Sequence, residues 1–270
     1  MAIDGIDVSA YQPNIDWAKV KASGVQTVII RAGYGKGNVD KCFKSHIEGA
    51  LSAGLAVGVY WFIYTLSMDD TLLNAKGFIN AIAPYKGKIT MKCWCDWEGD
   101  TDAYAGRNGV SFTKEQRTAH IRAFNDAVSN AGFEVGLYAN PNYLKNYFND
   151  MPEYPLWLAL YGTSRADRPC FMWQYTSKGI VDGIKGNVDR NYIYDVIPPI
   201  PPAMPTIASP TVRLGSTGAN ALLLQKNLNR FGYHLTEDGI FGQKSVDALA
   251  GWQFATGLSA DGVYGSASEK

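Results

Sequence analysis

The sequence predicts an α/β fold, an incomplete TIM-like β/α barrel followed by a small C-terminal all-α module. Over the first 197 residues, short segments rich in Val, Ile and aromatic residues alternate with segments of helical periodicity. A proline-rich stretch then precedes a tail with a different pattern. The expected domains are therefore a barrel at 1–197, a linker at 198–210 and a helical module at 211–270.

Eight segments are expected to form strands because they are short, apolar and rich in β-branched or aromatic residues, as buried parallel strands are. The later segments follow one another too closely for a full helix between every pair. We therefore expect loops between the last strands, which makes the barrel incomplete. The expected strands are Ile3–Val8, Thr27–Arg31, Ala56–Phe62, Thr90–Asp96, Glu134–Ala139, Leu156–Leu160, Phe171–Tyr175 and Gly186–Asn191.

Helices are expected between several of these strands. Asn14 is a candidate N-cap for the first helix, whose Trp17 and Val20 would face inward. The stretch Thr113-Lys-Glu-Gln116 is a capping box, in which two side chains satisfy the free backbone N–H groups at a helix start. The expected helices span 14–24, 41–53, 70–82 and 113–132.

The turns and helices of the C-terminal tail are predicted from a short sequence repeat. Asp238-Gly-Ile-Phe-Gly242 recurs 23 residues later as Asp261-Gly-Val-Tyr-Gly265, and each copy has glycines where a tight turn needs unusual backbone angles. Helices are expected over 214–231 and between the two turns. The sequence stops just after the second turn, so we expect the module to lack a final helix.

Charge and hydropathy argue against several functional classes. The 25 Lys and Arg residues balance 25 Asp and Glu residues, so neither nucleic acid nor an anionic membrane is an expected partner. The sequence contains no run of about 18 apolar residues, so it predicts no membrane-spanning segment. The N-terminus lacks the basic and apolar regions of a signal peptide. We therefore expect synthesis in the cytoplasm, and any substrate outside the cell would require release by another factor.

Cysteines and histidines do not indicate metal or thiol chemistry. Cys93 and Cys95 lie two apart on an expected strand, too far apart for good disulfide geometry, and no second pair or nearby histidine suggests zinc. A G-x-S-x-G nucleophile elbow is absent. No metal or cofactor is expected. All four cysteines are expected to be buried thiols and the histidines structural or surface residues: Cys42, Cys93, Cys95, Cys170, His46, His120 and His234.

Polar and aromatic side chains fall at the end of each expected strand. In β/α barrels the active site is built at the C-terminal ends of the strands, so these side chains would meet in one place. One such residue would be ordinary strand-end polarity, but a full set indicates a site. The set is Asp7, Arg31, Tyr60, Asp96 with Glu98, Tyr138, Tyr161, Gln174 with Tyr175, and Asp189.

The segment Asp96-Trp-Glu98 is the sharpest local feature. Residues two apart on a strand point the same way, with Cα atoms roughly 6.5–7 Å apart. Two carboxyl groups in one partly buried cleft titrate at different pH values, so one stays ionised while the other holds a proton. Glycoside hydrolysis needs such a pair. The alternative is that D-x-E is a common pattern of solvated loops.

A series of motifs occurs in order over residues 3 to about 195. Together they resemble the glycoside hydrolase family 25 lysozymes of the Chalaropsis type. The motifs are Gly5-Ile-Asp-Val-Ser-Ala-Tyr-Gln12, Ile30-Arg-Ala-Gly-Tyr-Gly35, Gly58-Val-Tyr-Trp-Phe62, Asp96-Trp-Glu98, Gly136-Leu-Tyr-Ala139, Leu156-Trp-Leu-Ala159, Trp173-Gln-Tyr175 and Val188-Asp-Arg-Asn191.

The tail resembles the helical peptidoglycan-binding module of wall hydrolases. This likeness is carried by Arg213-Leu-Gly, Leu224-Gln225, Phe231-Gly-Tyr233 and the two repeated turns. The two parts together resemble a phage endolysin or a bacterial autolysin. The missing signal peptide favours a phage product that acts on the wall after release.

The resemblance implies an N-acetylmuramidase that cuts the β-1,4 bond between N-acetylmuramic acid and N-acetylglucosamine in peptidoglycan, with no cofactor. It implies Glu98 as general acid. Asp96 would orient or charge-stabilise the N-acetyl group of the substrate, while Asp7 and Asp189 would support the cleft or position water. The individual roles of these aspartates stay open. The implied substrate-binding residues are Tyr60, Tyr138, Arg31, Tyr34, Tyr161, Gln174 and Tyr175.

Two departures from the family pattern stand out. The stretch Lys92-Cys-Trp-Cys95 is bulkier than the usual strand, and Lys92 shares a face with Asp96. Lys92 is expected to pair with an acid at the barrel bottom, unless the strand begins later. The short tail predicts that the module binds weakly.

Two other functions remain as alternatives. A chitinase or endo-N-acetylglucosaminidase also uses D-x-E on a barrel strand, but the wall-binding tail argues against chitin. A glycan-binding protein that has lost catalysis is the second alternative. The joint presence of four acids argues against it: Asp7, Asp96, Glu98 and Asp189. The sequence leaves the target wall and the oligomeric state open.

Overall fold

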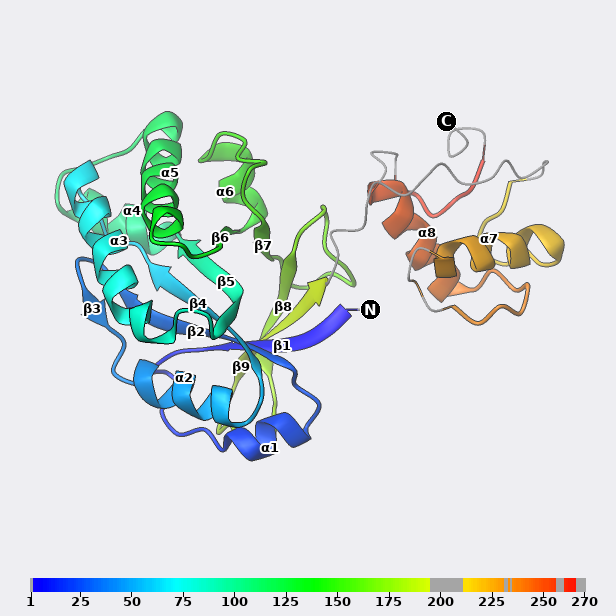
Figure 1. Cartoon of the computed structure of the whole chain (residues 1–270). Helices are drawn as coiled ribbons and strands as arrows, with labels where there is room; N and C mark the ends of the chain where they lie inside the picture. The colour runs from blue at the N-terminus through cyan, green and yellow to red at the C-terminus, as the bar shows by residue number, and fades with distance from the viewer. Residues whose placement is uncertain (1, 195–210, 231–232, 234, 256–259, 266–270) are drawn as a thin grey trace. The chain divides into compact units, whose positions relative to one another are not determined.

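The computed structural model describes residues 2–194, 211–230, 233, 235–255 and 260–265. The chain divides into two compact units, one of Ala2–Ala166 with Cys170–Asp195 and the other of the remaining residues (Figure 1). Each unit is described by itself. The predicted linker at 198–210 lies outside the described residues, as does His234.

The larger unit is a closed barrel of eight strands. The sheet runs in the order β1-β9-β8-β7-β6-β5-β4-β2, and parallel pairing of β1 with β2 closes it. A short extra strand, β3, pairs antiparallel with β2. The predicted fold class is confirmed. The strands are β1 (Ala2–Val8), β2 (Thr27–Tyr34), β3 (Asn38–Val39), β4 (Ala56–Phe62), β5 (Ile89–Asp96), β6 (Val135–Ala139), β7 (Leu156–Ala159), β8 (Met172–Gly179) and β9 (Val188–Tyr194).

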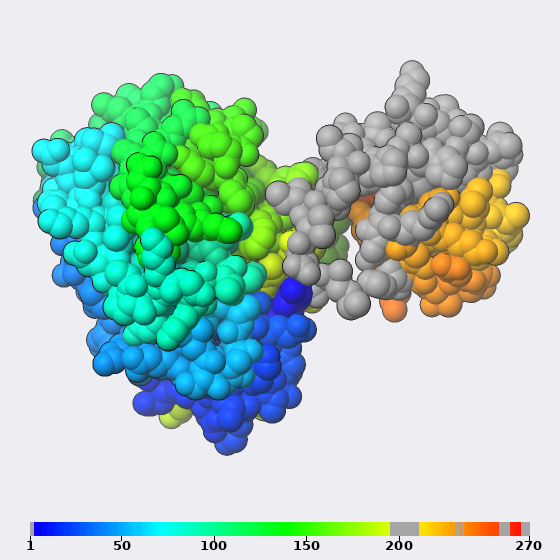
Figure 2. Space-filling model, viewed as in Figure 1, coloured from blue at the N-terminus to red at the C-terminus, as the bar shows by residue number. Residues whose placement is uncertain are grey.

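Helices cover the outside of the barrel (Figure 1), and Figure 2 shows the same face of this unit as a continuous surface coloured from blue to green. As predicted, loops alone join β7 to β8 and β8 to β9, all within described residues. Helices α4 and α6 were not predicted, although Asn140 before Pro141 is a helix-start signal. The helices are α1 (Trp17–Ala22), α2 (Phe43–Ser52), α3 (Met68–Ile82), the 3₁₀ helix η1 (Ala83–Tyr85), α4 (Gly99–Arg107), α5 (Lys114–Asn130) and α6 (Pro141–Asn146).

The predicted helix starts are correct in one case and wrong in another. Thr113 and Gln116 form the expected capping box at α5. Helix α1, in contrast, is capped by Asp16 rather than Asn14, because the Asp16 side chain accepts a hydrogen bond from the Lys19 N–H at 3.1 Å. Residue 15 is already bridged to Ile184, so the backbone there is extended and the helix cannot begin earlier.

Strand β9 runs antiparallel to both of its neighbours, β1 and β8. The prediction of parallel strands is wrong here. The loop between β8 and β9 is too short for the crossover that a parallel connection needs. The reversal brings the start of β9 to the barrel end where the parallel strands finish, and Asp189 lies opposite Asp7.

Alternate residues of each strand fill the barrel interior. A buried apolar cluster occupies its middle, and three glycines make room for that cluster. A Cβ added at Gly5, Gly58 or Gly136 would come within 2.4–2.5 Å of a side chain of the cluster. The outer faces of the strands pack on the helices in a second, larger core. The interior cluster includes Ile29, Trp94, Tyr138, Trp157, Met172 and Ile193.

A bulge interrupts β5 near its start. Its pairing with β4 skips from Ile89 to Cys93, and Lys92 has a φ of 68°. The bulge turns Met91 toward the interior cluster and breaks the regular alternation between Lys92 and Asp96, and the Lys92 ammonium lies 5.0 Å from the centre of the Phe171 ring. Lys92 donates a hydrogen bond to Glu134 at 2.7 Å, which confirms the expected pairing with an acid.

The smaller unit is built on α7 (Ala219–Arg230) and α8 (Gln243–Ala255). Helix α7 begins later than residue 214, because Gly215 and Gly218 have positive φ angles that interrupt a helix. The hydrophobic core of the smaller unit joins both helices to the two repeated turns. It contains Val212, Ala221, Leu224, Leu228, Phe241, Ala248, Leu249, Trp252 and Tyr264.

The two repeated turns are held in the same way. Gln225 donates hydrogen bonds to the Asp238 carboxylate and the Ile240 carbonyl, and accepts one from the Gly239 N–H. Gln253 makes the equivalent three bonds to the second turn. The first glycine of each turn has positive φ, as predicted. The repeat is therefore structural, one glutamine and one turn for each helix.

Two further observations bear on the predicted chemistry. All four cysteines are buried thiols, as expected. Within the described residues, no helix combines the length and apolar character needed to cross a bilayer.

The inward-facing glycines lead to a stability prediction. Gly58→Ala would place a Cβ 2.5 Å from both Ile29 Cδ1 and the Met91 carbonyl oxygen, so we expect it to lower the free energy of unfolding by about 1–3 kcal/mol. The control is Gly106→Ala in α4, where the added Cβ meets open space and should stabilise the helix by about 0.5–1 kcal/mol. Urea unfolding monitored by tryptophan fluorescence measures both. Equal effects of the two substitutions would contradict this account of the barrel interior.

Candidate active site

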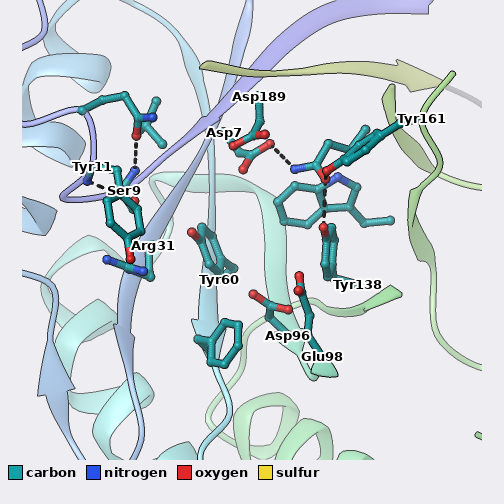
Figure 3. Close-up of a pocket in the computed structure, with 15 residues that line it drawn as sticks. Asp7, Ser9, Tyr11, Arg31, Tyr60, Asp96, Glu98, Tyr138, Tyr161 and Asp189 are labelled. Carbon is teal, nitrogen blue, oxygen red and sulfur yellow. Dashed lines mark hydrogen bonds between the residues drawn. The ribbon is translucent and has the colours of Figure 1, made fainter. Parts of the chain in front are cut away.

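A cavity of about 280 Å³ opens at the barrel end where the parallel strands finish (Figure 3). Strand alternation puts polar side chains here, above the apolar interior cluster. The loop after β1 and the first residue of β9 that faces inward complete the wall. The lining residues are Asp7, Val8, Ser9, Tyr11, Gln12, Arg31, Tyr60, Phe62, Asp96, Glu98, Tyr138, Trp157, Tyr161, Gln174 and Asp189.

The cavity brings together all of the predicted site residues except Tyr34 and Tyr175. Tyr175 follows the inward-facing Gln174, so alternation turns its ring outward, where it stacks on Tyr192 with ring centroids 4.5 Å apart. Tyr34 lies beyond an irregularity in the β2–β4 register and is 38% exposed outside the cavity. Neither ring lines the cavity, and a substrate-binding role for Tyr34 and Tyr175 stays a prediction.

The four acids lie in two pairs. Figure 3 shows Asp7 and Asp189 together on one side of the cavity and Asp96 and Glu98 together on the opposite side. The first pair comes from the antiparallel register of β1 and β9. The second pair comes from the end of β5 and the residue that caps α4. A ligand in the cavity therefore meets a carboxyl pair on each side.

Asp7 is held by two side-chain amides. Its Oδ2 accepts hydrogen bonds from Gln174 Nε2 and Asn191 Nδ2, each at 2.8 Å. Gln174 in turn accepts from the hydroxyls of Tyr138 at 2.8 Å and Tyr161 at 2.5 Å. Because these donors fix which way each amide points, the orientation of the Asp7 carboxylate is set by a network that spans the barrel.

Asn191 and Trp157 were not predicted as site residues. Asn191 is fully buried, and its Oδ1 accepts a hydrogen bond from Trp157 Nε1 at 2.8 Å. Trp157 also lines the cavity. A signal for Asn191 was present in the sequence, because a residue two positions after Asp189 on a strand must face the same way.

Strand β5 ends at Asp96, where the expected strand also ends, so Glu98 lies just beyond it. Glu98 is the N-cap residue of α4, with φ −129° and ψ −173°. This extended backbone continues the alternation of the strand, so Trp97 is buried in the outer core while Asp96 and Glu98 both face the cavity. Thr101 braces the position by accepting a hydrogen bond from the Glu98 N–H at 3.3 Å.

Burial raises the pKa of all four acids. It raises the pKa of Glu98, and the charges of Asp100 and Asp189 add to the shift while the Tyr138 hydroxyl opposes it. Burial brings the pKa of Asp189 to about 6. The pKa values of Asp7 and Asp96 lie well above the usual range, because burial and neighbouring carboxylates both disfavour their ionised forms.

Asp96 carries an unsatisfied acceptor. It is 5% exposed, and its Oδ1 has no hydrogen-bond partner in the described part of the chain. A buried oxygen without a partner costs about 1–3 kcal/mol, so a donor supplied by a ligand would be strongly favoured there.

Among the residues that the structure describes, Arg31 is the one basic side chain that lines the cavity. Its Nε donates to Asp40 Oδ2 at 2.7 Å, and its guanidinium lies 5.3 Å from the centre of the Tyr11 ring. Asp40 is buried and also accepts hydrogen bonds from the backbone N–H groups of Ala10 and Cys42. The Arg31 charge lowers the pKa of Asp96, partly offsetting burial.

The other polar clusters do not add a metal site. Among the described residues, no group of three or more histidine, cysteine or acidic side chains is arranged to hold a metal ion. His46 lies against the Ser9 carbonyl and His120 bonds Thr71, so both are buried structural residues as expected. The cavity presents a ligand with four carboxyl groups in two facing pairs, each with a raised pKa.

Comparisons with known families match both units. Residues 6–184 match glycosyl hydrolases family 25, and residues 217–268 match a peptidoglycan binding domain. The autolytic lysozyme of Clostridium acetobutylicum is 30% identical over 269 residues, covering 97% of this chain and 76% of that protein. Lysozyme M1 of Streptomyces globisporus is 28% identical, covering 70% of this chain and 67% of that protein.

Solved structures share the barrel. The CTP1L endolysin superposes with a TM-score of 0.61 at 28% identity, covering 72% of this chain and 67% of that one. A family 25 glycosyl hydrolase from Bacillus anthracis gives a TM-score of 0.61 at 26% identity, covering 72% of this chain and 89% of that one.

The burial of Asp96 leads to a prediction about stability and pH. Its pKa is raised on folding, so the stability that its protonated form gives is present at low pH and is lost as pH rises. Asp96→Asn removes this loss. We expect the melting temperature to rise by about 2–4 °C at pH 8, the effect of about 1 kcal/mol in a domain of this size, and by less at pH 4.5. Calorimetry with the exposed Asp69→Asn as control tests this, and an increase independent of pH would contradict it.

Proposed function

The chain belongs to glycosyl hydrolase family 25 and hydrolyses the glycan of bacterial peptidoglycan, and from this premise we propose that Glu98 is its general acid. The observation that carries this proposal is the position of Glu98, which faces the cavity from a helix N-cap and is only half-buried beside the buried Asp96, with a raised pKa. A carboxyl group with a raised pKa keeps its proton near neutral pH, where a leaving glycosidic oxygen needs one.

We propose that Asp96 binds the N–H of the substrate's 2-acetamido group. Its Oδ1 is the buried acceptor without a partner, beside Glu98. With the N–H held there, the acetamido oxygen can attack C1 as Glu98 protonates the departing oxygen, so the glycosidic bond breaks and a C1–O bond forms. A water molecule then attacks C1 and gives its proton to the Glu98 carboxylate, which restores both the acetamido group and the acid.

Asp7 and Asp189 would act from the opposite side of the cavity. Asp189, whose pKa is about 6, is largely ionised at neutral pH and can stabilise the positive charge that develops at C1 and the ring oxygen. The network around Asp7 keeps that carboxylate in place before the substrate arrives. The two aspartates therefore provide electrostatic support, and Tyr60, Tyr138, Tyr161, Gln174 and Arg31 bind sugar or brace the carboxyl groups.

The smaller unit would serve as a wall anchor. We retain the division into a barrel at 1–197, a linker at 198–210 and a module at 211–270 as part of the proposal. Tethering keeps a catalytic unit at high local concentration beside an insoluble polymer. The site of action is then the cell wall, and the balanced charge of the chain calls for neither a nucleic acid nor a membrane partner.

The central test replaces the acid. Glu98→Gln keeps the shape of the side chain and removes its proton, so we expect the release of reducing ends from purified Gram-positive walls to fall at least about 100-fold. Glu115→Gln, the same change on an exposed turn of α5, is the control. Free amines are measured in parallel. Free amines without reducing ends would indicate an amidase or peptidase, and undiminished reducing ends in Glu98→Gln would remove Glu98 from the role of acid.

A second test changes the pKa of Glu98 from outside the cavity. The charge of Asp100, exposed in the first turn of α4, raises that pKa. In Asp100→Asn the acid loses its proton at lower pH, so the alkaline limb of the kcat/KM profile should move down by roughly 0.2–0.5 pH units. Asp69→Asn, the equivalent change in the first turn of α3, should not move it. High salt should reduce the shift between Asp100→Asn and the wild type, because it screens the Asp100 charge. A shift of the alkaline limb to higher pH would refute Glu98 as the general acid.

A further inference from the structure

The cavity is small for a polymeric substrate. Its volume of about 280 Å³ lies just below the range of roughly 300–1,000 Å³ that encloses small-molecule ligands. A glycan strand extends on both sides of the bond that is cut, so most of the sugars near that bond must lie on surface outside the cavity. The surface that continues the cavity is therefore the place to look for further sugar contacts.

A row of tyrosines continues the cavity on one side. We call Tyr11, Tyr34, Tyr64 and Tyr104 the tyrosine strip. Figure 3 shows Tyr11 and Arg31 on the side of the cavity away from Tyr138 and Tyr161. The Arg31 guanidinium lies 5.3 Å from the Tyr11 ring centre and 5.7 Å from that of Tyr34, so it joins the first two members.

The remaining members follow by direct ring contact. The ring centres of Tyr34 and Tyr64 are 6.2 Å apart, and those of Tyr64 and Tyr104 are 5.2 Å apart. Phe62, which lines the cavity, lies 5.0 Å from Tyr64. The tyrosine strip thus runs without a break from the loop after β1, past the ends of β2 and β4, to helix α4.

The tyrosine strip is exposed but rigidly held. Tyr11 is 82% exposed and Tyr34 38% exposed, whereas Tyr64 and Tyr104 are half-buried. Buried Asn74 donates to the Tyr64 carbonyl at 2.9 Å, and its Oδ1 accepts from the indole N–H of Trp61 at 3.3 Å. The same indole N–H donates to the carbonyl of Gly35, the residue after Tyr34. One buried side-chain network therefore fixes the backbone under two neighbouring rings.

Rings of this kind match the chemistry of a glycan. A pyranose has partly apolar faces and a rim of hydroxyl groups, and an exposed tyrosine offers an apolar ring face with a polar tip. Preorganised rings lose little conformational entropy on binding. Exposed aromatic surface that runs directly into a cavity marks a ligand-binding surface rather than ordinary surface.

We propose that the tyrosine strip is an extended carbohydrate subsite that holds the part of the glycan strand beyond the sugars in the cavity. This inference rests on the function proposed above. Glycan is the occupant because the strip and the cavity share Tyr11 and meet at Arg31 and Phe62, so a strand that leaves the cavity on this side runs onto the strip. The consequence is a preference for long glycan chains over short ones.

The test compares peptide-free GlcNAc–MurNAc oligomers of two lengths, a tetrasaccharide and an octasaccharide. Tyr104→Ala and Tyr34→Ala should each lower kcat/KM for the octasaccharide about 5- to 10-fold, the loss of one aromatic contact, with much smaller losses for the tetrasaccharide. Tyr34→Phe, which keeps the ring, should recover most of the octasaccharide rate. The control is Tyr192→Ala, because Tyr192 is 36% exposed, close to the 38% of Tyr34, but stacks on Tyr175 outside the cavity.

Each outcome decides between the proposals. Equal losses on both oligomers, or no loss on either, would overturn the subsite while leaving Glu98-dependent cleavage intact. A length effect that appears only when stem peptides are attached would assign the strip to peptide and overturn the glycan inference. If the wild-type enzyme cleaves neither oligomer, the glycosidase function itself fails and the subsite with it.

Discussion

The antiparallel pairing of β9 with β1 is the constraint on which the site depends. It joins the last strand of the barrel to the first and places Asp189 directly opposite Asp7 in register. The same strand direction turns Asn191 inward, where it donates to Asp7 at 2.8 Å. A parallel strand at this position would carry these residues to the other end of the barrel. One reversed strand therefore supplies one of the four carboxyl groups in the cavity, Asp189, and part of the network that orients Asp7.

In the barrel, the residues that stabilise the fold and the residues that form the site lie in different layers. The apolar cluster in its middle and the larger core outside the strands provide the burial that folds the unit. The polar layer above works against folding, because it buries acids whose ionised forms are disfavoured. Hydrogen bonds from Gln174 and Asn191 offset this for Asp7, while Asp96 keeps an oxygen without a partner. The oxygen left unsatisfied is the one most useful to a substrate donor, as expected where function opposes stability.

Much of this arrangement could be predicted from the sequence, because strand alternation and strand-end polarity are local patterns. They placed Asp7, Asp96 and Glu98 at one barrel end before any tertiary contact was known. Alternation should also have excluded Tyr175, since Gln174 and its neighbour cannot both face inward. Other features depend on events that alternation does not encode.

The direction of β9 follows from the length of one loop. Bulges break the alternation of β2 between Arg31 and Gly33 and that of β5 before Cys93. A bulge depends on how two strands pair, so the alternation of either segment alone does not predict it. Asn191 could be predicted only in part. Its inward direction follows from Asp189, but its orientation depends on a hydrogen bond from Trp157, which lies on a strand distant in sequence.

The balanced charge of the chain limits how it can hold its substrate. With 25 basic and 25 acidic residues, long-range attraction cannot draw the enzyme to a wall, so affinity must come from contacts at short range. The cavity is too small to supply many of them. A tethered wall-binding module raises the local concentration of glycan, but it does not align a strand with the acids. Alignment needs contacts that are fixed relative to Glu98. The tyrosine strip meets this need, because Tyr104 lies on α4, the helix that Glu98 caps, and the strip and the acid are therefore positioned by the same element.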